Sequence, residues 1–216
     1  MKNNLPAFEQ MAIAAAKSLK RQSELLRGRT LLRSVFRKIY DLDLPDKLAV
    51  SDSGKPTAHQ GRPFNLSHSN GVLALVLGDS GELGVDVECD NSDRKFLNIV
   101  KNYGTEKEIL DIESTEPSGR AKKFYAHWCL KESYSKATGQ GLNTGLKDIE
   151  FNLEDNKFSL KLNKPACYFQ YLTLGNHHAS ICHFSSDIFL TKAYEVSFVN
   201  HEFVFKTLNV TINTIT

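Results

Sequence analysis

The sequence predicts an α+β protein with antiparallel sheets. Apolar residues recur at helical spacing through residues 8–40, and a second helix is expected over residues 124–138, ending at Gly139. Most of the chain after residue 149 consists of short stretches rich in aromatic and branched residues, which are typical of strands. Each half therefore combines helices with short strands, and no internal repeat is present, which together favour an α+β architecture.

Composition and charge indicate an ordinary globular protein. The chain has 216 residues, of which 41% are hydrophobic and 24% charged, enough to build a core as one domain or two small halves. A net charge of +2 is too weak a bias to indicate nucleic acid as a partner. No apolar run approaches the roughly 20 residues of a membrane span, and the run at residues 11–16 is too short for a secretory signal. The 4 cysteines are widely spread without a CxxC pair, so we expect reduced thiols, no zinc site and a cytoplasmic protein.

The N-terminal helical segment is expected between residues 8 and 40, with Gly28 as a weak point between two pieces. Basic residues crowd this segment, and they have only Glu24 as a counter-charge among them. They are Lys17, Lys20, Arg21, Arg27, Arg29, Arg33, Arg37 and Lys38. Such a run usually forms a solvated helix face, but it also suits an electropositive wall for phosphates.

Strands and a polar loop are expected next. Residues 63–71 have the pattern of a strand leading into a loop, in which Ser67 and His68 fit ordinary turn chemistry as well as a functional role. Residues 72–77 are wholly apolar and residues 83–88 alternate, so we expect these two stretches to pair as a hairpin around an intervening glycine turn.

Two further helices and a set of strands complete the expected elements. Helices are expected over residues 94–102 and 105–112, and the second begins with a capping box formed by Thr105 and Glu108. Residues 113–119 are expected to be a loop. The expected strands after the second long helix are residues 149–153, 157–162, 167–174 and 179–184.

Three carboxylates and one lysine carry the main chemical pattern. Asp86 and Glu88 alternate with valines, which places both on one face of a strand. Glu132 and Lys136 stand four residues apart and share one face of the expected helix, a spacing that also describes most surface ion pairs. Carboxylate oxygens are the ligands that Mg²⁺ prefers, and Mn²⁺ accepts them as well. The set suits magnesium-dependent phosphoryl or pyrophosphate chemistry, although Asp-x-Glu alone is a common string.

Four strings in a fixed order carry a more specific signal. They are GKP at residues 54–56, FNLSHS at 64–69, GVDVE at 84–88, and WCLKESYSK at 128–136 with GQGL at 139–142. With these strings the chain closely resembles the Sfp-type 4′-phosphopantetheinyl transferases between residues 54 and 142. A weaker likeness extends upstream through residues 27–33, and the strands after residue 149 match only in character.

The resemblance implies a fold and an activity. It implies two similar lobes in a pseudo-twofold arrangement, each with a small antiparallel sheet and helices, and the active site between them. We expect residues 1–81 to form the N-terminal lobe and residues 82–216 the C-terminal lobe, which carries the metal site. The implied reaction transfers 4′-phosphopantetheine from coenzyme A to a serine of an apo acyl or peptidyl carrier protein and releases 3′,5′-ADP. A monomer serving fatty acid, polyketide or nonribosomal peptide synthesis is expected, with neither nucleic acid nor membrane as a partner.

The resemblance also implies residues for metal binding and catalysis. Asp86, Glu88 and Glu132 match the family's magnesium ligands. Lys136 matches the lysine that contacts the coenzyme A phosphates and assists the leaving group. Asp86, Glu132 and Lys136 are therefore the expected catalytic residues, with Glu132 deprotonating the carrier serine directly or through a water.

A further set of residues is expected to hold the nucleotide part of coenzyme A. These residues are Lys55, Ser67, His68 and Arg29. Arg21 and Arg33 are rivals of Arg29 among the early basic residues. Two departures from the family pattern are visible. Cys129 stands where many members carry Ser or Thr, and NYGTE at residues 102–106 stands where an aromatic-rich stretch is usual.

Other interpretations stay open on the sequence alone. A magnesium-dependent phosphohydrolase acting on nucleotides would use the carboxylates but would leave His68 and the GKP string without a role. A non-catalytic module that binds coenzyme A or a carrier would have no need of three carboxylates and a lysine. A metal site at His177, His178 and His183 is disfavoured, because adjacent histidines on a strand point to opposite faces and no acidic residue lies nearby in the sequence.

Overall fold

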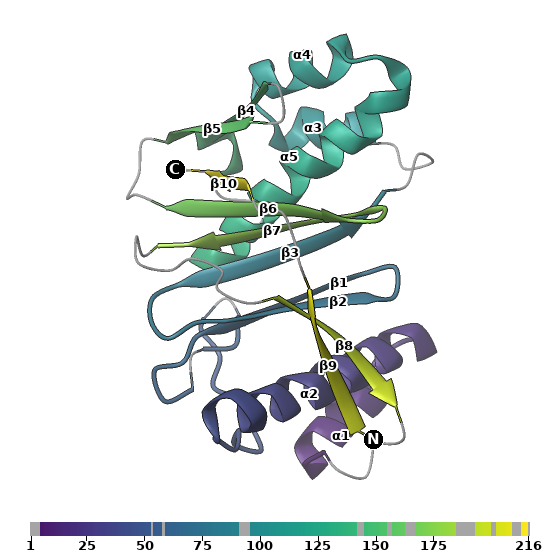
Figure 1. Cartoon of the computed structure of the whole chain (residues 1–216), viewed down its shortest axis with the longest axis vertical. Coiled ribbons are helices and arrows are strands. Elements are labelled where there is room, and N and C mark those ends of the chain that lie inside the picture. Colours follow the sequence, from purple (N-terminus) through teal and green to yellow (C-terminus); the bar gives the residue numbers. More distant parts are fainter. Residues whose placement is uncertain are drawn as a thin grey trace.

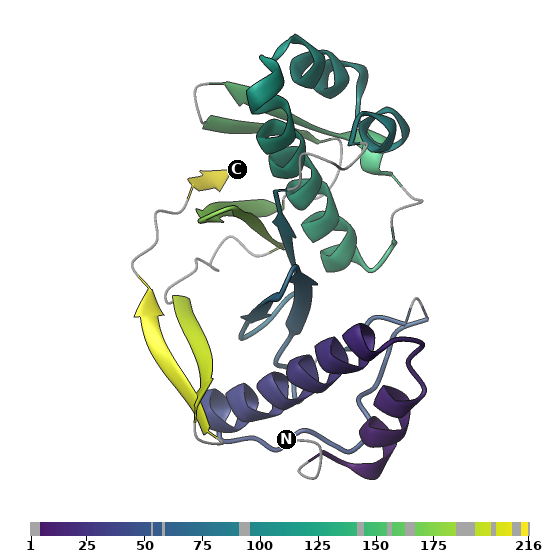
Figure 2. The same ribbon diagram turned by 90° about the vertical axis from the view of Figure 1, so that its right-hand side faces the viewer.

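The chain has helices at two ends and strands between them (Figure 1). Helices α1 (Ala7–Ala14) and α2 (Leu19–Tyr40) form one end, and α3 (Phe96–Tyr103), α4 (Glu106–Ser114) and α5 (Pro117–Thr138) form the other, as the rotated view also shows (Figure 2). All described strand pairs are antiparallel, so the predicted α+β class is confirmed. This computed structural model describes residues 5–52, 54–57, 59–90, 96–141, 145–154, 157–162, 167–184, 193–199, 202–208 and 213–215.

Helix α2 is one continuous helix of 22 residues. It begins after Ser18, whose side chain accepts a hydrogen bond from the Arg21 N–H at 3.2 Å. The helical segment breaks at residues 15–18, between α1 and α2, so the prediction of a break at Gly28 was wrong. Gly28 is buried within α2, and a Cβ there would lie 3.4 Å from the side chain of Leu66. Gly28 therefore packs against the strand that carries Leu66, a tertiary contact that local sequence does not reveal.

Strands β1 (Phe64–Ser69) and β2 (Val72–Leu77) form an antiparallel hairpin. Asn70 and Gly71 join the two strands and have φ values of 43° and 86°. A two-residue type I′ turn needs positive φ at both positions, and Asn-Gly is the dipeptide that adopts it most readily. This turn reverses the chain directly after β1.

The β1–β2 hairpin corrects two predictions. Ser67 and His68 lie within β1 rather than in a loop. Strand β2 pairs with β1 rather than with the strand that follows it, so the predicted hairpin of residues 72–77 with 83–88 was wrong. The physical reason is the Asn-Gly turn, which already closes a hairpin on the other side of β2.

Strand β3 (Leu83–Cys89) belongs to a four-stranded sheet of order β10–β6–β7–β3. Its neighbour is β7 (His177–His183), which forms a hairpin with β6 (Tyr168–Leu174) around Gly175. Strand β10 (Asn213–Ile215) adds to the far edge of β6. The two strands predicted on either side of Gly175 are therefore confirmed.

Local signals at the helix ends are also confirmed. The Glu108 N–H donates to Thr105 Oγ1 at 3.3 Å, and the Thr105 N–H donates to Glu108 Oε2 at 2.9 Å, which completes the predicted capping box of α4. Helix α5 ends at Gly139, which has the left-handed φ of 69° expected of a C-cap. It begins at Pro117, earlier than predicted, so the loop expected over residues 113–119 is much shorter.

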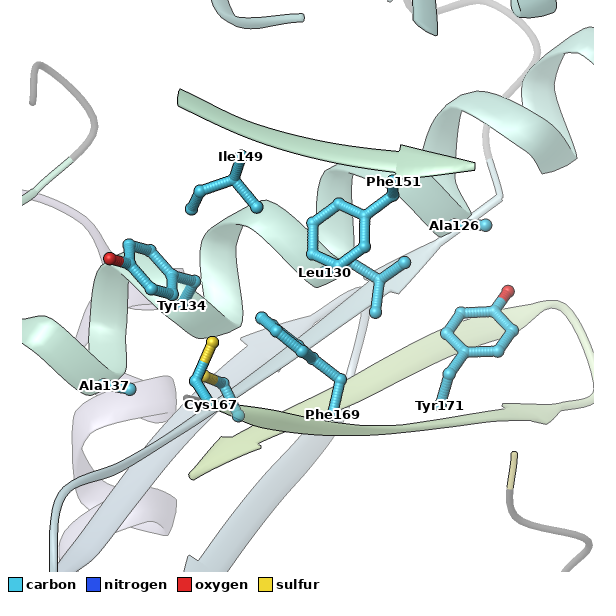
Figure 3. Packing of buried hydrophobic residues seen from close by; sticks show 10 residues of the cluster. Ala126, Leu130, Tyr134, Ala137, Ile149, Phe151, Cys167, Phe169 and Tyr171 are labelled. Atoms are coloured by element: carbon cyan, nitrogen blue, oxygen red, sulfur yellow. The ribbon is translucent and has the colours of Figure 1, made fainter. Parts of the chain in front are cut away.

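Helix α5 packs on the four-stranded sheet and on β4 (Ile149–Glu154), which pairs with β5 (Lys157–Leu162) (Figure 3). The buried residues of this core cluster are Ala126, Leu130, Tyr134, Ala137, Ile149, Phe151, Cys167, Phe169, Tyr171 and Cys182. Gly84 allows the helix to lie directly on β3, because a Cβ there would overlap the Ser133 carbonyl oxygen and the Ala137 nitrogen. The packing of α5 on β3 therefore requires glycine as the first residue of the GVDVE string.

The last part of the chain reaches back to α2. Strands β8 (Ala193–Val199) and β9 (Glu202–Leu208) form a hairpin beside α2 in both views (Figures 1 and 2). The Lys38 Nζ lies 4.2 Å from the centroid of the Phe205 ring, a cation–π contact between helix and hairpin. The chain then returns to the four-stranded sheet as β10.

Some predictions fall on residues that the structure does not describe. These are the expected helix start at residue 94 and the last residue of the GQGL string, residue 142. Among the described residues, no helix is both long enough and apolar enough to cross a membrane.

Candidate active site

Strands β1 and β3 run side by side and are joined by side chains of β1. Each of three β1 side chains accepts a hydrogen bond from the backbone N–H of a β3 residue 20 positions later. The pairs are Asn65 Oδ1 with Val85 N (2.9 Å), Ser67 Oγ with Val87 N (3.4 Å) and Ser69 Oγ with Cys89 N (3.1 Å). Since the offset is constant, the two strands are parallel. We call these three contacts the β1–β3 ladder, and they bring the FNLSHS and GVDVE strings together.

Asp86 is the centre of a polar cluster at this ladder. Its Oδ1 accepts hydrogen bonds from Lys136 Nζ at 2.6 Å and Ser67 Oγ at 2.9 Å, and Lys136 Nζ also donates to Ser67 Oγ at 2.7 Å. Two residues further along β3, Glu88 Oε2 accepts a hydrogen bond from Ser69 Oγ at 3.0 Å. Asp86 is only 3% exposed, and its Oδ2 is buried without a hydrogen-bond partner in the described part of the chain.

The same end of β3 lies under one face of α5, the face that carries Cys129, Glu132 and Lys136. We call these three residues the α5 stripe. Burial raises the pKa of the Cys129 thiol, and the nearby carboxylates of Asp86 and Glu88 raise it further. Glu132 follows Cys129 by three residues and precedes Lys136 by four, so all three side chains belong to one helix face. The two outer members of the α5 stripe, Cys129 and Lys136, both lie beside Asp86, and a place of Glu132 at the two carboxylates of β3 stays a prediction.

The chemistry of these carboxylates fits a divalent cation. A buried carboxylate oxygen without a partner is costly, and a cation at Asp86 Oδ2 would supply the missing interaction. Asp86, Glu88 and Glu132 also offer the all-oxygen ligand set that Mg²⁺ prefers. Among the described residues, no three His, Cys, Asp or Glu side chains are gathered closely enough to form a complete metal site.

His68 on β1 faces the first turns of α2. The Arg21 Nη1 donates to His68 Nε2 at 2.6 Å, and Glu24 Oε2 lies 3.5 Å from His68 Nε2 and 3.4 Å from Arg21 Nη1. The side chains of Arg21 and His68 are 50% and 34% exposed, so a ligand in solvent can reach both. Arg21 was predicted as a rival phosphate contact, and the structure places it next to the predicted histidine.

Arg29 lies on another side of α2. Its Nη1 is 3.9 Å from Glu9 Oε1 on α1, and Arg33 Nε is 3.0 Å from Glu9 Oε2. The structure therefore brings Arg21 to His68 and directs Arg29 and Arg33 towards Glu9. A role of Arg29 in binding coenzyme A stays a prediction.

Lys55 of the GKP string caps the C-terminal end of α5. Its Nζ donates to the carbonyl oxygens of Ala137 at 2.6 Å and Leu83 at 3.2 Å. A cation here is favoured by the negative end of the helix dipole. Burial lowers the pKa of Lys55, and the charge of Glu82 opposes this shift. A contact of Lys55 with a nucleotide stays a prediction.

Lys131, next to Glu132 in the WCLKESYSK string, has a structural role. Its Nζ donates to the carbonyl oxygens of Leu146 and Ile149, both at 2.6 Å, and lies 3.0 Å from Glu108 Oε2. Burial acts to raise the pKa of Glu108, but a hydrogen bond with His127 and the charge of Lys131 bring it below its ordinary value. This buried pair joins α4, α5 and the start of β4.

Two features of the site were missed by the sequence reasoning. Ser69 contacts Glu88, and the signal for it was available, since the serines of FNLSHS alternate with the same spacing as the carboxylates of GVDVE. His178 stands opposite Glu88 on β7. Its Nδ1 lies 2.5 Å from the Tyr171 hydroxyl and its Nε2 lies 3.4 Å from Asp90 Oδ2. Burial lowers the pKa of this histidine.

Comparisons with known proteins agree with the strings that meet at this site. Residues 82–182 match the family model described as the 4′-phosphopantetheinyl transferase superfamily. The chain is 31% identical over 153 residues to the 4′-phosphopantetheinyl transferase Sfp of Bacillus subtilis (strain 168), covering 66% of this chain and 65% of Sfp. It is 35% identical over 133 residues to the 4′-phosphopantetheinyl transferase AcpT of Salmonella typhi, covering 59% of this chain and 64% of AcpT.

A third relative comes from an animal. The L-aminoadipate-semialdehyde dehydrogenase-phosphopantetheinyl transferase of Xenopus laevis is 29% identical over 187 residues, which cover 71% of this chain and 60% of that protein. The chain thus spans less than two thirds of the length of each of these three relatives. The family match includes β3 and α5, which carry the two residues of the Asp86–Lys136 contact. Residues 82–182 of the chain are therefore similar to the 4′-phosphopantetheinyl transferase superfamily, and longer parts of the chain are similar to these three relatives.

Proposed function

We propose that this protein transfers 4′-phosphopantetheine from coenzyme A to a serine of an apo acyl or peptidyl carrier protein and releases 3′,5′-ADP. The observation that carries the proposal is the contact of Lys136 Nζ with Asp86 Oδ1 and Ser67 Oγ, at 2.6 and 2.7 Å. Three of the four family strings meet in this contact. A lysine and a carboxylate in contact beside β1 suit chemistry on a diphosphate, whose charge must be neutralised in the transition state.

Asp86, Glu88 and Glu132 are the proposed ligands of a magnesium ion, and Mn²⁺ would accept the same oxygens. The unpartnered Oδ2 of Asp86 supports this assignment. When bound, the ion would neutralise charge on the diphosphate oxygens of coenzyme A. Ser67 fixes Asp86 by donating a hydrogen bond to Oδ1, which leaves Oδ2 as the oxygen for the cation.

Glu132 and Lys136 have complementary roles in the proposed transfer. The carrier serine oxygen attacks the β-phosphorus of coenzyme A, and the bond from this phosphorus to the bridging oxygen of the 3′,5′-ADP leaving group breaks. Glu132 takes the serine proton directly or through a water, because it stands one helical turn from Lys136 on the same face. Lys136 neutralises the charge that develops on the departing 3′,5′-ADP.

The nucleotide part of coenzyme A is proposed to lie along β1 towards α2. The exposed pair of Arg21 and His68 offers hydrogen-bond donors to a phosphate, and Lys55 is a further candidate that the family resemblance implies. The resemblance implies Arg29 as well, but its position beside Glu9 favours Arg21 as the contact. We propose the division between the lobes at residues 81 and 82, with the active site along their boundary. The β1–β3 ladder supports this division, because one strand comes from each side of it.

We propose that the protein acts in the cytoplasm and as a monomer. All cysteines of the chain, Cys89, Cys129, Cys167 and Cys182, are free and buried, which suits a reducing compartment. The monomeric state follows from the family resemblance, in which a single chain supplies both lobes.

Release of 3′,5′-ADP tests the proposed reaction. Coenzyme A and Mg²⁺ are incubated with the protein and an apo carrier, and the nucleotide products are separated by chromatography. We expect 3′,5′-ADP only when the carrier has its acceptor serine, and none with a serine-to-alanine carrier. Nucleotide turnover that proceeds equally without any carrier would contradict the proposal and would indicate a phosphohydrolase.

A further inference from the structure

We propose that Ser69 is a positioning residue for the metal site, which holds the carboxylate of Glu88 in the orientation that binds the cation. Ser69 belongs to the FNLSHS string, but the family resemblance implies no role for it. The inference rests on the proposed function, since it takes Glu88 as a metal ligand.

Ser67 and Ser69 make the same pair of hydrogen bonds to β3. Ser67 Oγ accepts from the Val87 N–H at 3.4 Å and contacts Asp86 Oδ1 at 2.9 Å. Ser69 Oγ accepts from the Cys89 N–H at 3.1 Å and contacts Glu88 Oε2 at 3.0 Å. Each serine therefore binds one carboxylate and the backbone of the residue after it.

The direction of these hydrogen bonds follows from chemistry. A backbone N–H only donates and an ionised carboxylate only accepts, so each hydroxyl accepts from the N–H and gives its own proton to the carboxylate. The Cys89 N–H thus orients the Ser69 hydroxyl, and the hydroxyl orients Glu88. Hydrogen bonds to charged acceptors are stronger than those between neutral groups, so this arrangement restricts the long Glu88 side chain effectively.

The first rung of the β1–β3 ladder provides an internal comparison. Asn65 Oδ1 accepts from the Val85 N–H at 2.9 Å, as the serines do at their rungs. The residue before Val85 is Gly84, which has no carboxylate to bind. Asn65 can therefore only join the strands, whereas Ser69 joins the strands and also fixes a carboxylate.

Residues that hydrogen-bond a metal ligand typically change metal affinity by 10- to 100-fold when they are removed. We therefore expect Ser69→Ala to weaken Mn²⁺ binding about tenfold. The affinity is measured without substrates, by calorimetry or by the electron paramagnetic resonance signal of free Mn²⁺. In kinetics, the Mg²⁺ concentration for half-maximal rate should rise about tenfold while the KM for coenzyme A stays the same.

Asn65→Ala is the matched control. It removes one rung of the ladder, and we expect it to lower the melting temperature about as much as Ser69→Ala does, with unchanged Mn²⁺ affinity. Ser69→Thr and Ser69→Val form a second pair of nearly equal shape, of which only threonine keeps the hydroxyl. Threonine should restore Mn²⁺ affinity and valine should not, which keeps the inference testable if Ser69→Ala folds poorly.

The outcomes separate this inference from the proposed function. If wild type, Ser69→Ala and Ser69→Val all bind Mn²⁺ with equal affinity, the proposed role of Ser69 is overturned. The proposed transferase activity would not be affected by this result. Equal weakening by Asn65→Ala and Ser69→Ala would also overturn it, because loss of a rung would then explain the effect. A wild-type protein that neither binds Mn²⁺ nor transfers would overturn both proposals.

Discussion

Lys136 Nζ donates a hydrogen bond to Asp86 Oδ1 at 2.6 Å, although 50 residues separate the two in the sequence. Gly84 makes this contact possible, because only a residue without a side chain lets α5 lie directly on β3. The side chains of Asp86 and Lys136 are 4% and 28% exposed, so the pair lies where the core meets solvent. This position keeps the carboxylate fixed and leaves the lysine accessible to a phosphate.

The first prediction concerns Lys136. We expect Lys136→Gln to lower kcat by about 100-fold or more, because a positioned charge at the leaving group is lost, while the KM for the carrier changes little. Steady-state transfer kinetics provide the measurement. Lys122→Gln is the control, since Lys122 is an exposed lysine of the same helix, and it should keep full activity. A Lys136→Gln protein as active as the control would exclude a role of this lysine in the reaction.

The second prediction compares two glycines. A Cβ at Gly84 overlaps the α5 backbone, so Gly84→Ala should lower the free energy of unfolding by about 2–3 kcal/mol. Gly28 lies inside α2, where a Cβ would make an ordinary 3.4 Å contact with Leu66. Gly28→Ala should therefore be neutral or stabilise by up to about 1 kcal/mol. Urea denaturation measures both, and a Gly84→Ala protein as stable as wild type would refute the packing argument.

The third prediction concerns the buried pair of Glu108 and Lys131. Glu108→Gln leaves the ammonium of Lys131 buried without its counter-charge, so we expect a loss of about 3 kcal/mol in the free energy of unfolding at pH 7. Glu113→Gln on the same helix breaks the exposed contact with Lys101 and should cost less than about 1 kcal/mol. Similar losses in the two variants would contradict the structural role of the pair.

The same glutamate predicts a pH dependence. The pKa of Glu108 is lower in the folded protein than its ordinary value of 4.5. The unfolded chain therefore binds the proton first as the pH falls, and the stabilisation present above pH 4.5 is lost as the pH falls through the folded pKa. Unfolding measured between pH 6 and pH 3 should show a shallower loss of stability in Glu108→Gln than in wild type. Parallel curves would show that this carboxyl does not contribute.

The fourth prediction separates two arginines of α2. Arg21→Ala should raise the KM for coenzyme A about tenfold, because it removes a charge-assisted donor beside His68. Arg29→Ala should leave this KM nearly unchanged, since Arg29 lies towards Glu9, and its effect should appear in stability instead. Steady-state kinetics and thermal melting of both variants provide the measurement. The reverse pattern would show that coenzyme A binds along the other side of α2.

Signals contained within a few residues predicted the structure best. The capping box of Thr105 and Glu108 and the C-cap at Gly139 each depend on local backbone geometry, and both are confirmed. The predicted hairpin of residues 72–77 with 83–88 is wrong, because an apolar strand can pair on either edge and the Asn70-Gly71 turn pairs β2 with β1 instead. The predicted weak point at Gly28 is also wrong, and its packing partner Leu66 is too distant in the sequence for local patterns to reveal the contact.

The sequence predicted which residues belong to the candidate site better than it predicted how they are arranged in space. The four strings identified Asp86, Glu88, Glu132 and Lys136, but spacing within a string cannot show which strands become neighbours. The β1–β3 ladder depends on the approach of two strands from different parts of the chain, so the role of Ser69 required the fold. The choice between Arg21 and Arg29 likewise depends on which side of α2 meets α1.

The mass of an apo carrier protein after incubation with this protein, coenzyme A and Mg²⁺ tests the central claim most directly. Wild-type protein should add the mass of one 4′-phosphopantetheine group to the carrier. Chelation of the metal or the substitution Asp86→Asn should abolish the gain, because both remove the cation from the site. If none of several unrelated carriers gains mass, the proposed transferase activity is contradicted. If the gain is undiminished with Asp86→Asn, the proposed metal site is contradicted.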